Sequence, residues 1–155
     1  MKHWQLALAH AVVAVTLAVP RPGLAQSPAA RVEPHRQLLS LALDGYAKAR
    51  CGKELCAPAT AAERAKPPIT DDQARAVVTA ATISVLAEHC QLDWERRNFI
   101  PLMRHHRETL KMTERQMALV GLLHGVTMGA YAETVRKSTC TPEAKVATEK
   151  RLLAR

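Results

Sequence analysis

Aromatic residues are scarce in this 155-residue sequence, at 3% of the chain. Beyond the first 25 residues, the aromatic positions are Tyr46, Trp94, Phe99 and Tyr131. No nucleic-acid recognition motif is present either, although the formal net charge is +8. A basic chain with so few aromatic side chains and no such motif is an unfavourable candidate for nucleic-acid binding. We therefore expect a partner of another kind.

Motifs of catalytic and metal sites are also missing. The sequence has no Gly-x-Ser-x-Gly stretch, no pair of acidic residues at a catalytic spacing, and no His-x-x-x-His or Cys-x-x-Cys-His arrangement. A nucleophile with an adjacent base, or ligands at metal spacing, would be needed for these chemistries. The sequence predicts a non-enzymatic protein without a cofactor, and an enzyme stays open as an alternative.

The N-terminus has the pattern of a secretory signal peptide. Lys2 and His3 precede an apolar run over residues 4–19, and Gly23-Leu24-Ala25 provides small residues for cleavage. The run is shorter than the roughly 20 residues that span a bilayer, although an uncleaved anchor is the alternative. We expect a signal peptide over 1–25 and a single domain over 26–155, periplasmic or secreted and not transmembrane after cleavage.

Four cysteines, Cys51, Cys56, Cys90 and Cys140, lie in the expected mature chain. An even number in an exported protein predicts two disulfides. If the helices predicted over 92–111 and 114–137 form an antiparallel hairpin, Cys90 and Cys140 meet at its open end. Cys51 then pairs with Cys56. A redox-active role for Cys51 and Cys56 is disfavoured, because the Cys-x-x-Cys spacing is absent.

Apolar residues recur at helical spacing in most of the remaining chain, and no strand-like alternation is present. The pattern predicts helices starting at Pro34 and over 71–89, 92–111, 114–137 and 142–153, with a kink near Pro101 and a long loop over 51–69. Thr70 with Gln73 and Thr113 with Gln116 are predicted capping boxes. The expected fold is an all-α, small antiparallel bundle of four to five helices stapled by two disulfides.

Three glycines, Gly121, Gly125 and Gly129, follow one another at four-residue spacing inside the predicted 114–137 helix. Each glycine in a helix costs about 1 kcal/mol relative to alanine. Such a stripe allows close approach of another helix, and the small residues of the 71–89 helix are the expected partner. We therefore expect Gly125→Leu to destabilise the fold by overpacking.

Basic residues cluster on the predicted 92–111 helix. The candidate partner-binding residues are Arg96, Arg97, Arg104, His105, His106, Arg107 and Lys111. The alternative is a solvated helix face with internal ion pairs. The binding hypothesis predicts a protein partner, which could be acidic, for an envelope-stress helper or an immunity-type inhibitor of a toxic enzyme.

A copper- or zinc-binding protein is the alternative function. Its candidate ligands are His105, His106, His124 and Met128, since imidazole and thioether groups suit copper. The alternative interpretation is that His124 and Met128, which lie at helical spacing, are residues of the hydrophobic core.

Two short stretches resemble a known family. Residues 69–73, Ile-Thr-Asp-Asp-Gln, and residues 112–116, Met-Thr-Glu-Arg-Gln, are similar to the Leu-Thr-x-x-Gln repeats of periplasmic stress chaperones of Spy/CpxP type. The resemblance implies a small, exported, all-helical protein with chaperone activity. It covers these ten residues, which also fit the capping-box pattern.

Overall fold

The computed structural model describes residues 33–153, so the predicted signal peptide over 1–25 lies outside the described residues. In chain order the elements are α1 (Pro34–Asp44), η1 (Tyr46–Lys48), β1 (Arg50–Cys51), β2 (Glu54–Leu55), α2 (Ala61–Ala65), α3 (Asp71–His89), η2 (Glu95–Phe99), α4 (Ile100–Arg104), η3 (His105–Thr109), α5 (Glu114–Arg136) and α6 (Pro142–Leu153). The predicted small all-α bundle is confirmed, with the short helix α2 added to it.

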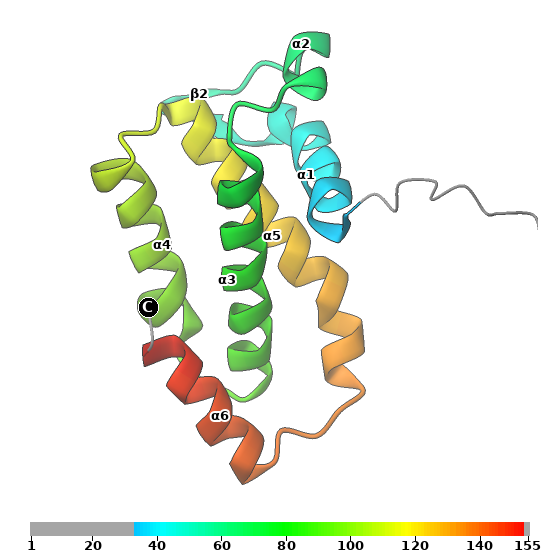
Figure 1. The fold of residues 1–155 in the computed structure, drawn as a ribbon, viewed down its shortest axis with the longest axis vertical. Helices are drawn as coiled ribbons and strands as arrows, with labels where there is room; N and C mark the ends of the chain where they lie inside the picture. Colours follow the sequence, from blue (N-terminus) through cyan, green and yellow to red (C-terminus); the bar gives the residue numbers. More distant parts are fainter. Residues whose placement is uncertain (1–32, 154–155) are drawn as a thin grey trace, which may run out of the picture. The chain divides into compact units, whose positions relative to one another are not determined.

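Helices α3 and α5 form the central pair of the bundle. We call the continuous helical run of η2, α4 and η3, residues 95–109, the α4 segment. In Figure 1, α3 lies between the α4 segment and α5. Helix α1 lies beside the first half of α5, and α6 runs past the lower end of α3. Both central helices start at the capping boxes predicted from the sequence. The Thr70 hydroxyl accepts from the Gln73 amide, and Thr113 and Gln116 form the same pair. Local capping chemistry therefore sets where both helices begin.

The core lies where α1, α3 and α5 meet. Its fully buried side chains include Tyr46, Val77, Leu119, Val120 and Leu123. Small residues of α3 pack among them, because alanine lets neighbouring helices approach closely. The buried residues of α3 include Val77, Ala80, Ala81 and Val85.

The segment from Glu95 to Thr109 is one helical run of three parts, in which two π-helical turns flank α4. Pro101 lies in the first turn of α4. A proline lacks an N–H group and clashes with the carbonyl four residues before it, so the helix around it must adjust. Here the wider π turn of η2 precedes the proline, and Lys111 ends the run in the left-handed region with φ of 52°.

Both disulfides pair as predicted. Cys90 joins Cys140 and Cys51 joins Cys56, and the described residues contain no free cysteine. Cys90 follows α3 immediately, whereas Cys140 lies between α5 and α6. The first disulfide therefore closes the end of the bundle from which α6 starts.

The expected 51–69 loop is partly wrong, because it contains secondary structure. Arg50 pairs with Leu55 and Cys51 with Glu54 in an antiparallel two-stranded hairpin. The turn uses Gly52 at φ of +75°, a conformation that favours glycine. Helix α2 follows, and Thr60 and Glu63 form its capping box. Strands of two residues are too short to give a period-two pattern in the sequence.

Across residues 33–153, none of the helices combines the length and the apolar character needed to cross a membrane.

Candidate functional site

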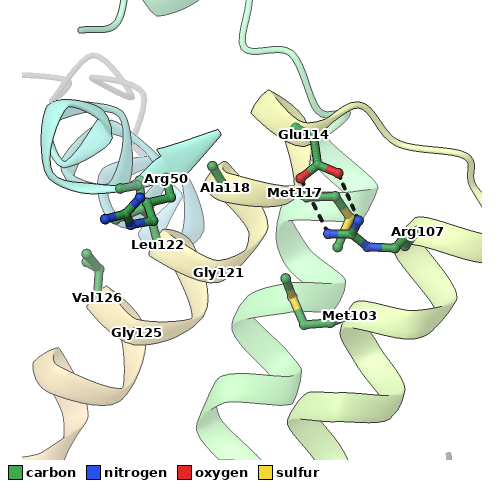
Figure 2. Close-up of a pocket in the computed structure, with 11 residues that line it drawn as sticks. Arg50, Met103, Arg107, Glu114, Met117, Ala118, Gly121, Leu122, Gly125 and Val126 are labelled. Carbon is green, nitrogen blue, oxygen red and sulfur yellow. Dashed lines mark hydrogen bonds and ion pairs between the residues drawn. The ribbon is translucent and has the colours of Figure 1, made fainter. Parts of the chain in front are cut away.

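An open groove runs between α5 and the α4 segment. Its volume is about 450 Å³. It is lined by Ala49, Arg50, Met103, Arg107, Glu114, Met117, Ala118, Gly121, Leu122, Gly125 and Val126. We call this hollow the glycine groove. Figure 2 shows Met103 and Arg107 facing the row of α5 that carries Ala118, Gly121 and Gly125. The lining is mainly apolar, with charged side chains from Arg50, Arg107 and Glu114.

Two glycines of the stripe, Gly121 and Gly125, form the floor of this groove instead of a helix contact. Apart from the two adjacent residues and the nearby backbone of α5 itself, no heavy atom lies within 4 Å of a Cβ placed on Gly125 or on Gly129. A Cβ on Gly121 would meet the Cε atom of Met103 at 3.9 Å, an ordinary contact. The prediction that the stripe packs tightly against the 71–89 helix is therefore wrong, and the overpacking predicted for Gly125→Leu has no close contact at Cβ to cause it.

The physical reason is that α5 uses a different face toward the core. Its buried residues are Met117, Leu119, Val120, Leu123, His124 and Thr127. From this side, His124 shares a 3.1 Å hydrogen bond with the Ser84 hydroxyl of α3. Large apolar side chains remove more apolar surface from water than glycine does, so they take the core side. Gly121 and Gly125 are left on the side that faces the groove.

The basic residues predicted to bind a partner divide into two groups. Arg96 pairs with Asp93 at 2.8 Å, Arg97 with Glu149 at 3.0 Å, and Arg107 with Glu114 at 2.8 Å. These three arginines fit the solvated-face interpretation with internal ion pairs. Arg104, His105 and Lys111 are exposed, and they form no ion pair within residues 33–153. Within the predicted cluster, the exposed cations that form no ion pair within these residues are therefore Arg104 and Lys111.

His106 does not contribute to the surface. Its side chain is 3% exposed, and its Nδ1 donates to the Leu102 carbonyl at 2.8 Å. Burial lowers the pKa of His106 below its ordinary value, because desolvation disfavours the charged imidazolium. His105 is exposed and contacts His106 edge to face, with ring centroids 5.7 Å apart. The two neighbouring histidines therefore occupy different environments.

The candidate metal ligands do not form a carboxylate, imidazole or thiolate cluster. His124 is buried, stacks on Trp94 with ring centroids 5.8 Å apart, and lies 4.7 Å from the Phe99 ring. In the described part of the chain, no group of three or more His, Cys, Asp or Glu side chains could hold a metal ion. His124 thus has the surroundings of a core histidine.

A buried polar cluster joins α3, η2 and α5 at this point. The Asn98 amide nitrogen donates to the Ser84 hydroxyl at 2.8 Å and to the Ala80 carbonyl at 2.7 Å. Ser84, Asn98 and His124 are at most 2% exposed. The serine–histidine contact is therefore closed to a substrate in solution, and it positions helices. The sequence could not reveal it, since Ser84 and His124 lie 40 residues apart.

Arg115 holds the segment before α3 against the start of α5. Its guanidinium pairs with Glu63, donates to the Ala57 and Pro58 carbonyls, and lies 4.1 Å from the centre of the Tyr46 ring. The hydrogen bond from Arg115 lowers the pKa of Glu63 to about 2. Burial raises the pKa of Tyr46 to about 12. Arg115 therefore has a structural role, unlike the exposed cations nearby.

Sequence reasoning missed the part that Met103 and Met117 play in the groove. The spacing of Met103 and Arg107 places both on one side of the α4 segment, which is a signal that could have been found. The groove-lining residues of α5 could not have been predicted in this way, since they depend on which stripe of that helix becomes buried.

No protein-family model, curated protein or solved structure matches the sequence. The two stretches similar to the stress-chaperone repeats act as helix caps in the structure. The function is therefore argued from the geometry of this chain.

Proposed function

We propose that this protein is an exported, non-enzymatic binding protein that recognises an acidic segment of a protein partner. Its binding face is the exposed side of α4 and η3, with Arg104, His105 and Lys111. The observation that carries the proposal is that these residues are exposed and have no acidic partner within residues 33–153. Solvated cations without a fixed partner attract and orient an oppositely charged surface.

The disulfides support the exported location. Disulfides persist in oxidising compartments and are rare in the cytosol, and both disulfides here join residues of one domain. Cleavage after Ala25 would remove Lys2 and Arg21, so 20 basic residues would face 14 acidic ones, a net charge of +6. An envelope-stress helper and an immunity-type inhibitor are the two roles that we propose for such a binding protein.

Charge reversal on the binding face tests the proposal. We would compare Arg104→Glu combined with Lys111→Glu against Lys145→Glu combined with Lys150→Glu on α6. Both double variants change the net charge equally, and all four side chains are exposed. Arg107 is left intact, because its replacement would also leave Glu114 without its ion-pair partner. The probe is a fluorescein-labelled, glutamate-rich peptide whose binding is followed by fluorescence anisotropy.

We expect the Arg104/Lys111 variant to lose at least about tenfold in affinity, mostly through slower association. The α6 variant should keep the affinity of the unaltered protein at equal ionic strength. Added salt should weaken binding to the unaltered protein, because exposed charges are screened. Equal losses in both double variants would contradict a site on α4 and η3 and would indicate a response to net charge alone.

A further inference from the structure

The glycine groove is an apolar surface that the described chain leaves uncovered. Gly125 is exposed, and no atom of another element lies within 4 Å of a Cβ placed on it. Met103 of α4 borders the floor on the side of Arg107, and Met117 lies one turn before Gly121 on α5 itself. A glycine lowers the stability of a helix, and no close contact within the structure compensates for this cost at Gly125. The groove therefore has the shape of a surface for another molecule.

The spacing of the floor residues fits a helix. Gly121 and Gly125 are four residues apart and therefore lie one turn apart on the same face of α5. The surface of α5 at these two positions carries no side chains. In helix packing, a ridge of side chains at four-residue spacing from one helix enters a groove on another. Methionine suits the walls, because its flexible thioether adapts to different side chains.

Charge then limits the kind of helix. Arg50 lies on one side of the groove and Arg107 on the other. Next to Arg107 in the sequence, the exposed cations Arg104 and Lys111 outnumber the exposed acid Glu108. Glu114 is the acidic residue among the lining side chains, and its carboxylate is engaged by Arg107. The surroundings of the apolar floor are therefore net basic. A second copy would bring two such basic rims together in a chain of net charge +8, which opposes self-association.

We propose that the glycine groove binds one amphipathic α-helix of the protein partner. Its apolar ridge lies on Gly121 and Gly125, and its acidic flanks face Arg50 on one side and the basic segment around Arg107 on the other. This inference rests on the proposed function. It adds that the bound segment is helical and that it binds in the glycine groove. Methionine-lined grooves elsewhere bind amphipathic helices in the same manner, through apolar anchors repeating every three to four residues.

Three fluorescein-labelled peptides of about 18 residues, a length at which a helix can form in water, provide the probes. The first carries leucine on one helical stripe and glutamate on both flanks. The second has the same composition with the leucines scattered around the helix. The third keeps the leucine stripe and carries lysine in place of glutamate. Binding of each is measured by fluorescence anisotropy at low and at high salt.

The matched variants are Gly125→Leu and Gly129→Leu. Both glycines lie in α5 with open space at Cβ, but Gly129 is not among the lining residues of the groove. We expect the first peptide to bind unaltered protein at least about tenfold more tightly than the other two, since affinity needs both the stripe and the acids. Gly125→Leu should reduce that affinity at least about tenfold by blocking the close approach, and Gly129→Leu should leave it unchanged.

Other outcomes separate this inference from the proposed function. Equal binding of the first and second peptides, or equal binding by Gly125→Leu, would overturn the groove while acid recognition stands. Binding of none of the peptides would overturn both. If sedimentation showed a dimer that Gly125→Leu disperses, the groove would instead be a contact between two copies of the chain.

A measurement on unaltered protein guards against misfolding of a variant. A photoreactive leucine analogue in the stripe of the first peptide should crosslink to the groove, at Met103 or at residues next to Gly125. Crosslinks confined to α1 or α6 would overturn the glycine groove as the binding site.

Discussion

The two sides of α5 differ although they belong to one helix with one periodicity. The core side carries Leu119, Val120 and Leu123, which are fully buried, and it bonds α3 through His124. The other side carries Gly121, Gly125 and Gly129, and open space lies next to two of these glycines. A four-residue repeat therefore identifies a helix but does not tell which of its stripes is packed. The packed stripe is the one that removes more apolar surface from water.

The largest expected effect is on the packed side. Leu123→Ala should lower the free energy of unfolding by about 3 kcal/mol, since it removes a fully buried side chain and leaves a cavity. Its neighbour Leu122 is half-buried and lines the groove, so Leu122→Ala should cost only about 1 kcal/mol. Urea unfolding followed by circular dichroism measures both values. Equal losses would remove the distinction between the two sides.

Acidification should affect the ion pair that anchors the packed start of α5. The pKa of Glu63 is about 2 in the folded protein against an ordinary value of 4.5, so its contribution to stability is complete above pH 4.5. This contribution is lost as the pH falls toward 2, on the order of 1 kcal/mol after solvent screening. Glu63→Gln should remove that part of the pH dependence. Unfolding titrations between pH 5 and pH 2 test this, and identical profiles for the two proteins would contradict it.

Small side chains on the open stripe should stabilise the helix. Gly129→Ala has no neighbour within 4 Å to displace, so it should raise the free energy of unfolding by up to about 1 kcal/mol. Gly121→Ala should behave similarly, because Met103 lies at an ordinary contact distance. Thermal unfolding of the two variants provides the measurement. A lower melting temperature for Gly129→Ala would mean that this side of α5 is covered.

The smallest effect belongs to the exposed ion pair beside the groove. Arg107 and Glu114 are both more than half exposed, at 55% and 51%. Glu114→Gln should therefore change the free energy of unfolding by less than about 0.5 kcal/mol, in contrast to Glu63→Gln. Urea unfolding at neutral pH compares the two variants. A larger loss from Glu114→Gln than from Glu63→Gln would reverse the assignment of packed and open sides.

Local sequence patterns predicted much of the fold. The helix starts at Asp71, Glu114 and Pro142 follow from caps that act within a few residues. The pairing of Cys90 with Cys140 followed from helix lengths, which depend on rise per residue alone. Thr60 and Glu63 offered the same capping signal for α2, which was missed because the surrounding prolines indicated a loop.

The candidate site was less predictable, because it depends on contacts between distant residues. Arg97 is paired by Glu149 and Arg115 by Glu63, at separations of 52 residues each. His106 is buried while His105 is exposed, although the two are neighbours in sequence. A list of basic residues could not distinguish those engaged in ion pairs from those free to bind. Only the packing of α4 against its neighbours makes that division.

The most direct test of the central claim is urea unfolding of Gly125→Leu. An open, uncovered stripe predicts that the variant folds and that its free energy of unfolding rises by up to about 1 kcal/mol, since leucine is the better helix former. A loss of several kcal/mol would contradict the account, because it would show a close helix contact at Gly125 that the leucine side chain disrupts.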